Sequence, residues 1–201
     1  MLCPNCSSNQ TIKYGIRTNK RGKDSQRYFC NSCRREFSTT LDLAESTSNV
    51  KRAIVTPDKH FPFEDKPAIN ALVKAISLVK PSIYVDLGDV GEWESVSQWK
   101  WKRKKMPPLE YVIPEIEKEI KAVNRGMDVI DEALDEVECD ERHFVEGNHD
   151  NWLNRFVEGY PYLDQYRLKT AIKLDDRGYT YHPFGKFLKI GKLFFYHGHQ
   201  Y

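Results

Sequence analysis

The strongest constraint on the fold of this chain is a pair of Cys-x-x-Cys motifs near its amino terminus. One motif joins Cys3 and Cys6, the other joins Cys30 and Cys33, and residues 7–29 separate them. Tetrahedral Zn²⁺ takes four thiolates in this pattern, because each short turn supplies two ligands. A segment of about 40 residues buries too little apolar surface to fold well alone, and structural zinc contributes about 10–16 kcal/mol to such modules. We therefore predict one structural zinc held by the four cysteines, with disulfide pairing as the alternative.

The residues between the cysteines indicate a zinc ribbon over residues 1–40. Residues 11–15 and 27–30 alternate like short strands, and residues 19–23 read as a basic turn. The run from Cys3 to Phe37 resembles the ribbon at the start of many transposase-associated and phage proteins. That resemblance implies DNA contacts through six cations, namely Lys20, Arg21, Lys23, Arg27, Arg34 and Arg35. The alternative is a rigid knob that docks another protein.

Charge is distributed unevenly along the chain. Residues 1–40 hold eight Lys and Arg against two acidic residues, a net charge of +6, whereas residues 41–201 carry −4. A basic amino-terminal segment followed by a mildly acidic domain is a pattern expected when the basic segment binds nucleic acid. We therefore expect nucleic acid as a partner, DNA more than RNA, while the sequence does not indicate an oligomeric state.

The sequence gives no sign of a membrane segment. No apolar run approaches the roughly 18 residues that a membrane span requires, and the first residues lack the regions of a secretory signal. We expect a cytoplasmic protein of a bacterial or phage-infected cell.

After a polar linker predicted at residues 41–50, the sequence has the texture of an α/β domain over residues 51–201. Strands are expected at 53–55, 83–87, 143–145 and 179–181, helices at 66–79 and 110–137, and a hairpin at 187–196 around Gly191. The second helix is expected either as one piece or as two pieces broken near Gly126. Strand-helix-strand order favours a sheet whose central strands are largely parallel.

Polar motifs follow three of the predicted strands, and a fourth lies near Tyr201. In order they are Asp58-Lys59-His60, Gly88-Asp89, Gly147-Asn148-His149-Asp150 and His197-Gly198-His199. Ligands of open α/β sheets gather outside the carboxyl ends of the strands. Asp58 and His60 are expected to point the same way from an extended segment, since side chains alternate there. Oxygen and nitrogen donors without thiolate suit Mn²⁺, Fe, Zn²⁺ or Ni²⁺.

The ordered set resembles the calcineurin-like metallophosphoesterases over about residues 51–201, and its Gly147–Arg155 segment is similar to the form in phage and prophage members. The resemblance implies an α+β sandwich with two divalent metal ions at its rim. Asp58 and His60 would hold the first ion, Asp89 would bridge both ions, and Asn148 and His197 would hold the second.

The last motif departs from the family pattern, which ends in Gly-His-x-His. Here the sequence reads Gly198-His199-Gln200-Tyr201, with tyrosine at the second histidine position. Either His199 belongs to a degenerate last motif and is a further metal ligand, or His197 is the preceding single-histidine motif and the last motif lies beyond residue 201. We expect the second, which makes the predicted domain incomplete at its carboxyl end.

The resemblance implies hydrolysis of a phosphoester by a hydroxide that two metal ions generate. His149 would act on the leaving oxygen as a general acid or electrostatic clamp, and Asp150 would orient the His149 ring or lie in solvent. We expect the ribbon to direct this activity to nucleic acid. The alternatives are a non-catalytic nucleic-acid-binding or adaptor protein with a degenerate phosphoesterase body, and a phosphatase of small molecules or phosphoproteins.

Overall fold

The structure is a computed structural model that describes residues 2–18, 24–38 and 51–198. The chain forms two compact units, Met1–Val50 and Lys51–Tyr201. Three of the predicted DNA-contacting cations, Lys20, Arg21 and Lys23, lie outside the described residues, as do the predicted linker at 41–50 and His199. Among the described helices, none is both long and apolar enough to cross a membrane.

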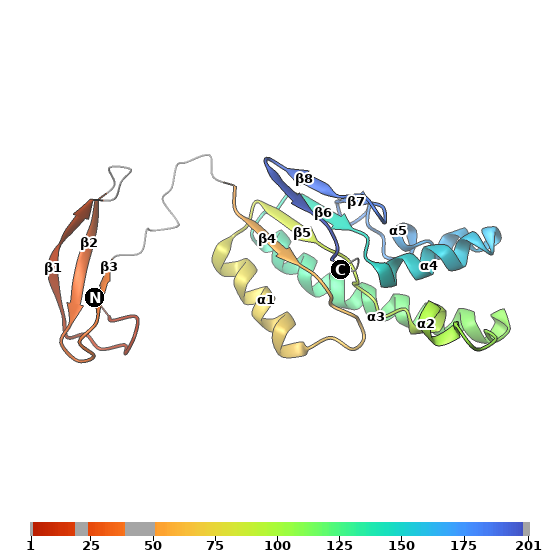
Figure 1. Cartoon of the computed structure of the whole chain (residues 1–201), viewed down its shortest axis with the longest axis horizontal. Coiled ribbons are helices and arrows are strands. Elements are labelled where there is room, and N and C mark those ends of the chain that lie inside the picture. The colour runs from red at the N-terminus through yellow and green to blue at the C-terminus, as the bar shows by residue number, and fades with distance from the viewer. Residues whose placement is uncertain (1, 19–23, 39–50, 199–201) are drawn as a thin grey trace. The chain divides into compact units, whose positions relative to one another are not determined.

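The amino-terminal unit is built on a three-stranded antiparallel sheet. Its strands are β1 (Thr11–Thr18), β2 (Asp24–Cys30) and β3 (Glu36–Ser38), in the order β1-β2-β3 (Figure 1). The aromatic rings of Tyr28 and Phe37 stack across β2 and β3 with their centroids 5.5 Å apart. Tyr14 and Phe29 form a second ring pair between β1 and β2, with centroids 6.5 Å apart. Among the described residues of this unit, the buried apolar ones are Cys3 and Cys30.

The second unit is a mixed α/β domain around a parallel sheet, as the order of its elements predicts. Four strands, β4 (Ala53–Thr56), β5 (Ile83–Asp86), β6 (Glu141–Val145) and β7 (Tyr179–His182), lie in the order β4-β5-β6-β7, and every neighbouring pair is parallel. All four residues of β5 are buried. A strand buried on both sides needs a layer on each face of the sheet.

The two faces of the sheet are covered by different elements. Helices α1 (Lys66–Val79) and α3 (Leu109–Glu136) lie side by side on one face, where Tyr84 and Phe144 join the main core (Figure 1). The hairpin of β8 (Leu188–Ile190) and β9 (Leu193–Phe195) covers the other face, where Leu188 packs on alternate strand residues. These alternate residues are Ile83, Val85 and Val145.

The remaining elements lie on the connections that follow β5, β6 and α4. They are the 3-10 helix η1 (Glu94–Val96), α2 (Gln98–Trp101), α4 (Asn148–Glu158), the 3-10 helix η2 (Pro161–Tyr166) and α5 (Leu168–Ala171). Helix α3 runs without a break through Gly126. A Cβ at this position would lie 2.3 Å from the ring of Phe61, so the glycine permits close packing and does not end the helix.

Candidate metal centre

The loop after β4 turns sharply, and the side chain of Lys59 points away from those of Asp58 and His60. Asp58 and His60 both have a left-handed backbone, with φ of 52° and 49°. The backbone N–H groups of Asp58 and His60 donate to the carbonyls of Gly88 and Asp89, with an N···O distance of 3.0 Å in each case. These hydrogen bonds join this loop to the one after β5. The prediction of an extended segment is therefore wrong, although the two side chains still lie close together, 3.8 Å between Asp58 Oδ1 and His60 Nε2.

Lys59 is buried beneath the loop and supports it from the other side. Its Nζ lies 2.8 Å from Asp86 Oδ2, and both side chains are at most 3% exposed. The second oxygen of Asp86 accepts the N–H of Gly88 over 3.0 Å. Burial raises the pKa of Asp86, and the charge of Lys59 opposes that rise. This ion pair ties the loop after β4 to the end of β5.

Two glycines allow the loops after β5 and β6 to approach each other closely. A Cβ on Gly88 would lie 2.2 Å from the backbone nitrogen of Gly147, and a Cβ on Gly147 would lie 2.2 Å from Asp89 Oδ1. Gly88 also has a φ of +85°, which other residues rarely adopt. The glycines of the two motifs therefore bring Asp89 against the start of α4.

Asp150 has a different task from the one predicted. It is fully buried, and its carboxylate accepts from the N–H of Asp89 at 2.7 Å, the N–H of Gly147 at 3.2 Å and Nε1–H of Trp93 at 2.9 Å. Burial and the nearby charge of Asp89 raise its pKa to about 7. Asp150 is neither a solvated loop residue nor the partner of the His149 ring; it positions the backbone of Asp89.

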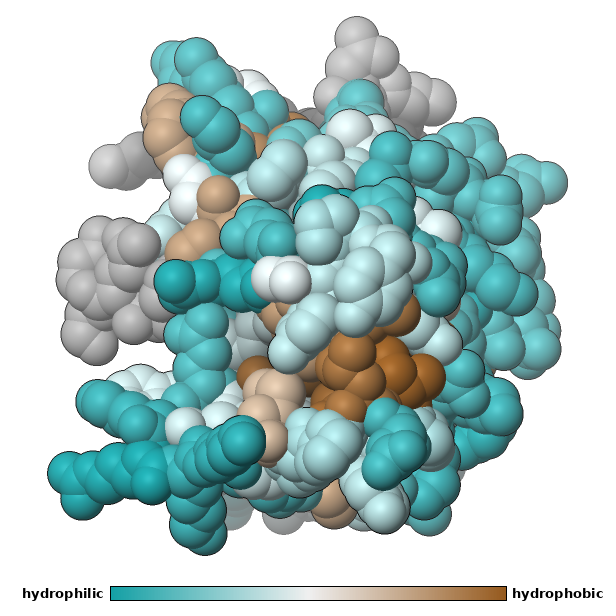
Figure 2. Space-filling model, turned by 90° about the vertical axis from the view of Figure 1, so that its right-hand side faces the viewer, coloured by the Kyte–Doolittle hydropathy of each residue, from teal (hydrophilic) through white to brown (hydrophobic). Residues whose placement is uncertain are grey.

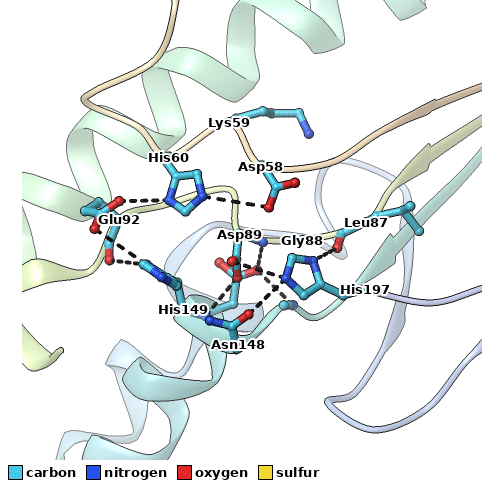
Figure 3. A network of polar contacts seen from close by, with 12 residues as sticks. Asp58, Lys59, His60, Leu87, Gly88, Asp89, Glu92, Asn148, His149 and His197 are labelled. Carbon is cyan, nitrogen blue, oxygen red and sulfur yellow. Dashed lines mark hydrogen bonds and ion pairs between the residues drawn. The ribbon is translucent and has the colours of Figure 1, made fainter. Parts of the chain in front are cut away.

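The first candidate ligand group consists of Asp58, Asp89 and His197, whose donor atoms lie within 4.8 Å of one another. His197 Nε2 lies 3.2 Å from Asp89 Oδ2 and 3.0 Å from Asn148 Oδ1, and its Nδ1 is 2.7 Å from the carbonyl of Leu87 (Figure 3). With an ion bound, Nδ1–H would stay on the Leu87 carbonyl while Nε2 gave up its proton and offered its lone pair to the metal, as in metal-binding histidines.

The electrostatics of this group favour positive charge. Burial lowers the pKa of His197, but the hydrogen bond and negative charge of Asp89 outweigh it and raise this pKa to about 9. Burial raises the pKa of Asp89, yet His197 and the N–H of His149 bring it below its usual value. A carboxylate that stays ionised at 3% exposure, beside oxygens of Asp58 and Asn148, suits a cation.

The second candidate group consists of His60, Glu92 and His149, again with donor atoms within 4.8 Å of one another. Glu92 Oε2 is 2.8 Å from His60 Nδ1, and Glu92 Oε1 is 3.7 Å from His149 Nδ1 (Figure 3). The His149 ring is held by the Glu92 carbonyl, 3.0 Å from Nδ1, and by stacking on Trp152 at 3.9 Å.

The two groups adjoin at Asp58 and His60, whose Oδ1 and Nε2 lie 3.8 Å apart. Asp58 clusters with Asp89 and His197, and His60 clusters with Glu92 and His149, so the implied sharing of one ion by Asp58 and His60 stays a prediction. Asp89 contacts both sides, because its Oδ1 accepts the N–H of His149 over 2.8 Å. Glu92 was not predicted as a ligand. Its only signal in the sequence is its place three residues after Asp89, and the direction of such a loop cannot be read from residue types.

The four amino-terminal cysteines form a third group, with their sulfurs within 4.8 Å of one another. The Sγ atoms of Cys3 and Cys33 are 3.6 Å apart, as are those of Cys6 and Cys30, and all four are free thiols. These distances exceed the roughly 2.05 Å of a disulfide. The cluster could hold a structural zinc ion.

Three of the predicted DNA-contacting cations belong to the described ribbon. Arg27 forms an ion pair with Glu36, and its guanidinium lies 4.9 Å from the Tyr14 ring centroid. Arg34 and Arg35 are exposed just after the second cysteine pair.

Comparison with known proteins gives a phage relative. The chain is 25% identical over 162 residues to the "Gene 54 protein" of Mycobacterium phage D29, an alignment that covers 75% of this chain and 57% of the relative. The chain thus spans little more than half the length of that protein. No family model matches the chain. No solved structure gives a significant match.

Proposed function

We propose that this chain is a metal-dependent phosphoester hydrolase of the calcineurin-like type. The observation that carries the proposal is the pair of adjoining donor groups at the carboxyl ends of β4, β5 and β6, with Asp89 in contact with a member of each. The loops after β4 and β5, the start of α4 and the segment after β9 supply these donors. Structural ion pairs rarely require three left-handed ligand residues and two crowded glycines, so this geometry favours a binding centre.

The residues fit two divalent cations. Asp58, Asp89 and His197, with the amide oxygen of Asn148, would hold one ion, and His60 and Glu92 would hold the other, with His149 beside it. These donors suit Mn²⁺, Fe, Zn²⁺ or Ni²⁺. When bound, such ions lower the pKa of water from 15.7 toward roughly 7 and neutralise charge on phosphoryl oxygens.

His149 is the residue we assign to the leaving group. Its Nδ1 faces the Glu92 carbonyl and its ring packs on Trp152, so the ring is held in one orientation and Nε2 is directed away from that carbonyl. With Nδ1–H donated to that carbonyl, a second proton on Nε2 makes the ring an imidazolium, and this Nε2 proton can pass to the leaving oxygen as the bond to phosphorus breaks. Trp93 and Asp150 contribute as positioning residues, since they fix the backbone of Asp89.

Nucleic acid is the substrate class that we propose, with DNA favoured over RNA. The net charge of +6 on residues 1–40 supports electrostatic attraction to a phosphate backbone. Arg34 and Arg35 are exposed cations in the described part of the amino-terminal unit. The phage relative is consistent with work in the cytoplasm of an infected bacterium.

Hydrolysis of bis(4-nitrophenyl) phosphate by the purified chain with Mn²⁺ tests the proposal. We expect turnover by the unaltered chain, a loss of at least about 100-fold for Asp89→Asn, and no loss for Lys74→Ala, an exposed substitution on α1. DNA binding without turnover under Mn²⁺, Fe²⁺, Zn²⁺ and Ni²⁺ would overturn the proposal in favour of a non-catalytic adaptor. Turnover of phosphomonoesters without salt-dependent DNA binding would assign the chain to small-molecule or phosphoprotein substrates.

A further inference from the structure

The loop between η1 and α3 carries an unusual concentration of positive charge. Residues 97–108 contain five Lys and Arg and no acidic residue, although the second unit as a whole is acidic. We call this segment, together with Arg155 of α4, the cationic surface. Figure 2 looks at this end of the second unit and shows hydrophilic side chains over most of the face.

Two hollows lie side by side on the cationic surface and share Lys102. The outer hollow, about 510 Å³, is lined by Trp99, Lys100, Lys102, Arg103 and Lys104. The inner hollow, about 400 Å³, includes Trp101, Lys102, Trp152 and Arg155 in its lining. Trp152 also stacks on the ring of His149 at 3.9 Å. The inner hollow therefore shares a wall with the candidate metal centre.

Trp99 is the residue that indicates what these hollows bind. Its side chain is 70% exposed, and Lys102 Nζ lies 5.1 Å from its ring centroid. Exposed tryptophan rings beside cations recur where proteins stack unpaired bases and neutralise the neighbouring phosphates. Two hydrogen bonds hold the backbone around Trp99 in place. Trp101 donates its Nε1–H to the carbonyl of Ser95 at 2.9 Å, and Ser97 Oγ accepts the N–H of Lys100 at 3.3 Å.

We propose that the cationic surface binds an extended single strand of nucleic acid and leads it toward His149. A base stacks on Trp99, Lys102 and Lys104 neutralise phosphates, and Arg155 contacts the strand at the inner hollow. A duplex has no free base face to stack on Trp99. An acidic peptide could pair with the lysines, but its carboxylates would not explain an exposed indole beside them. The delivery of a phosphodiester to the centre rests on the proposed function, whereas binding of the strand does not.

Fluorescence measurements on the full chain test this proposal with fluorescein-labelled oligodeoxythymidylate, whose bases remain unpaired. Anisotropy measures affinity, and quenching of tryptophan fluorescence by unlabelled oligonucleotide reports stacking. We expect Trp99→Ala to weaken binding at least about 10-fold and to remove most of the quenching. Lys102→Ala with Lys104→Ala should reduce the slope of log affinity against log salt by about 1.4, or roughly 0.7 for each lost phosphate contact.

Two exposed substitutions elsewhere in the second unit serve as matched controls. Lys74→Ala removes a cation and Phe187→Ala removes an aromatic ring that is 60% exposed, and we expect neither to change binding or quenching. The proposal is overturned if the Trp99 and lysine variants bind like these controls, because the strand then binds elsewhere, such as the ribbon. It is also overturned if duplex DNA or polyglutamate binds equally well with the same dependence on Trp99.

The readout separates this proposal from the proposed function. Strand binding is measured without turnover. If the Trp99 variant shows the expected effect but the chain hydrolyses no phosphoester, the strand-binding proposal stands and the proposed function fails. If the chain hydrolyses the small diester but the Trp99 and lysine variants match the controls, the proposed function stands and the strand-binding proposal fails.

Discussion

Buried residues that are not ligands themselves hold the ligand loops of the candidate centre in place. Lys59 stands between two predicted ligands in the sequence, yet its side chain is buried on the opposite side and pairs with Asp86. Removing one partner of a buried ion pair leaves an uncompensated charge in a poorly solvated place. This pair is therefore a strong determinant of the loop that carries Asp58 and His60.

We predict that Lys59→Met destabilises the chain by about 3–5 kcal/mol, because Asp86 loses its buried partner. Urea unfolding followed by circular dichroism measures the change. Lys51→Met is the matched control, since Lys51 forms an exposed ion pair with Glu141 and such pairs contribute about 0–1 kcal/mol. Equal effects of the two substitutions would show that the buried pair does not hold the loop.

Gly147→Ala tests the close approach of the loops after β5 and β6. The backbone of Gly147 has a φ of −87°, which alanine adopts freely, so the new Cβ acts mainly by its contact with Asp89. We expect hydrolysis to fall about 100-fold through displacement of Asp89. Gly159→Ala is the control, because its Cβ would have an ordinary contact of 3.4 Å with the Phe156 carbonyl. Full activity of Gly147→Ala would contradict the assigned role of Asp89.

Among the secondary-structure elements, apolar periodicity predicted helix bounds better than a single glycine predicted a helix break. The apolar spacing in Lys66–Val79 matched a helix with those bounds, and Gly191, with a φ of 59°, lies in the turn of the last hairpin. Local patterns work for such elements because regular backbone repeats the same side-chain geometry. They gave no warning that α3 continues through Gly126, since the packing of Phe61 against that glycine is a tertiary contact.

The candidate site was predicted through its motifs and missed where loops decide direction. Residue types and strand ends located Asp58, His60, Asp89, Asn148 and His197. The way these residues divide into two groups depends on left-handed backbone at Asp58, His60 and Asp89, which residue type does not specify. For the same reason Glu92 had no predicted role.

Zinc removal tests the amino-terminal unit as an element. Hydrogen bonding from the backbone N–H of Cys33, opposed by burial, lowers the pKa of Cys30 to about 6, whereas burial raises the pKa of Cys33 to about 12. A bound Zn²⁺ would therefore have to displace protons from part of the cluster. We expect one Zn²⁺ per ribbon, and we expect a chelator to release it and expose residues 2–38 to proteolysis, while residues 51–198 stay protected. A ribbon that stays protease-resistant without zinc would contradict a metal-held core.

At the scale of the whole molecule, a small basic unit and a larger α/β unit divide the proposed work. The first carries the cysteine cluster and a net charge of +6 over residues 1–40. The second carries both acid-histidine groups and the cationic surface. The proposed nucleic-acid partner could thus meet positive charge on each unit, and the proposed hydrolysis would take place on the second unit.

The central claim is that two ions at the adjoining donor groups act together in phosphoester hydrolysis. The most direct test is the initial rate of bis(4-nitrophenyl) phosphate hydrolysis as Mn²⁺ is titrated into the chain whose cysteine cluster retains its zinc. We expect the rate to rise to a plateau near two Mn²⁺ per chain and the Asp89→Asn rate to stay near background throughout. Stoichiometric Mn²⁺ binding without any rise in rate would contradict the claim.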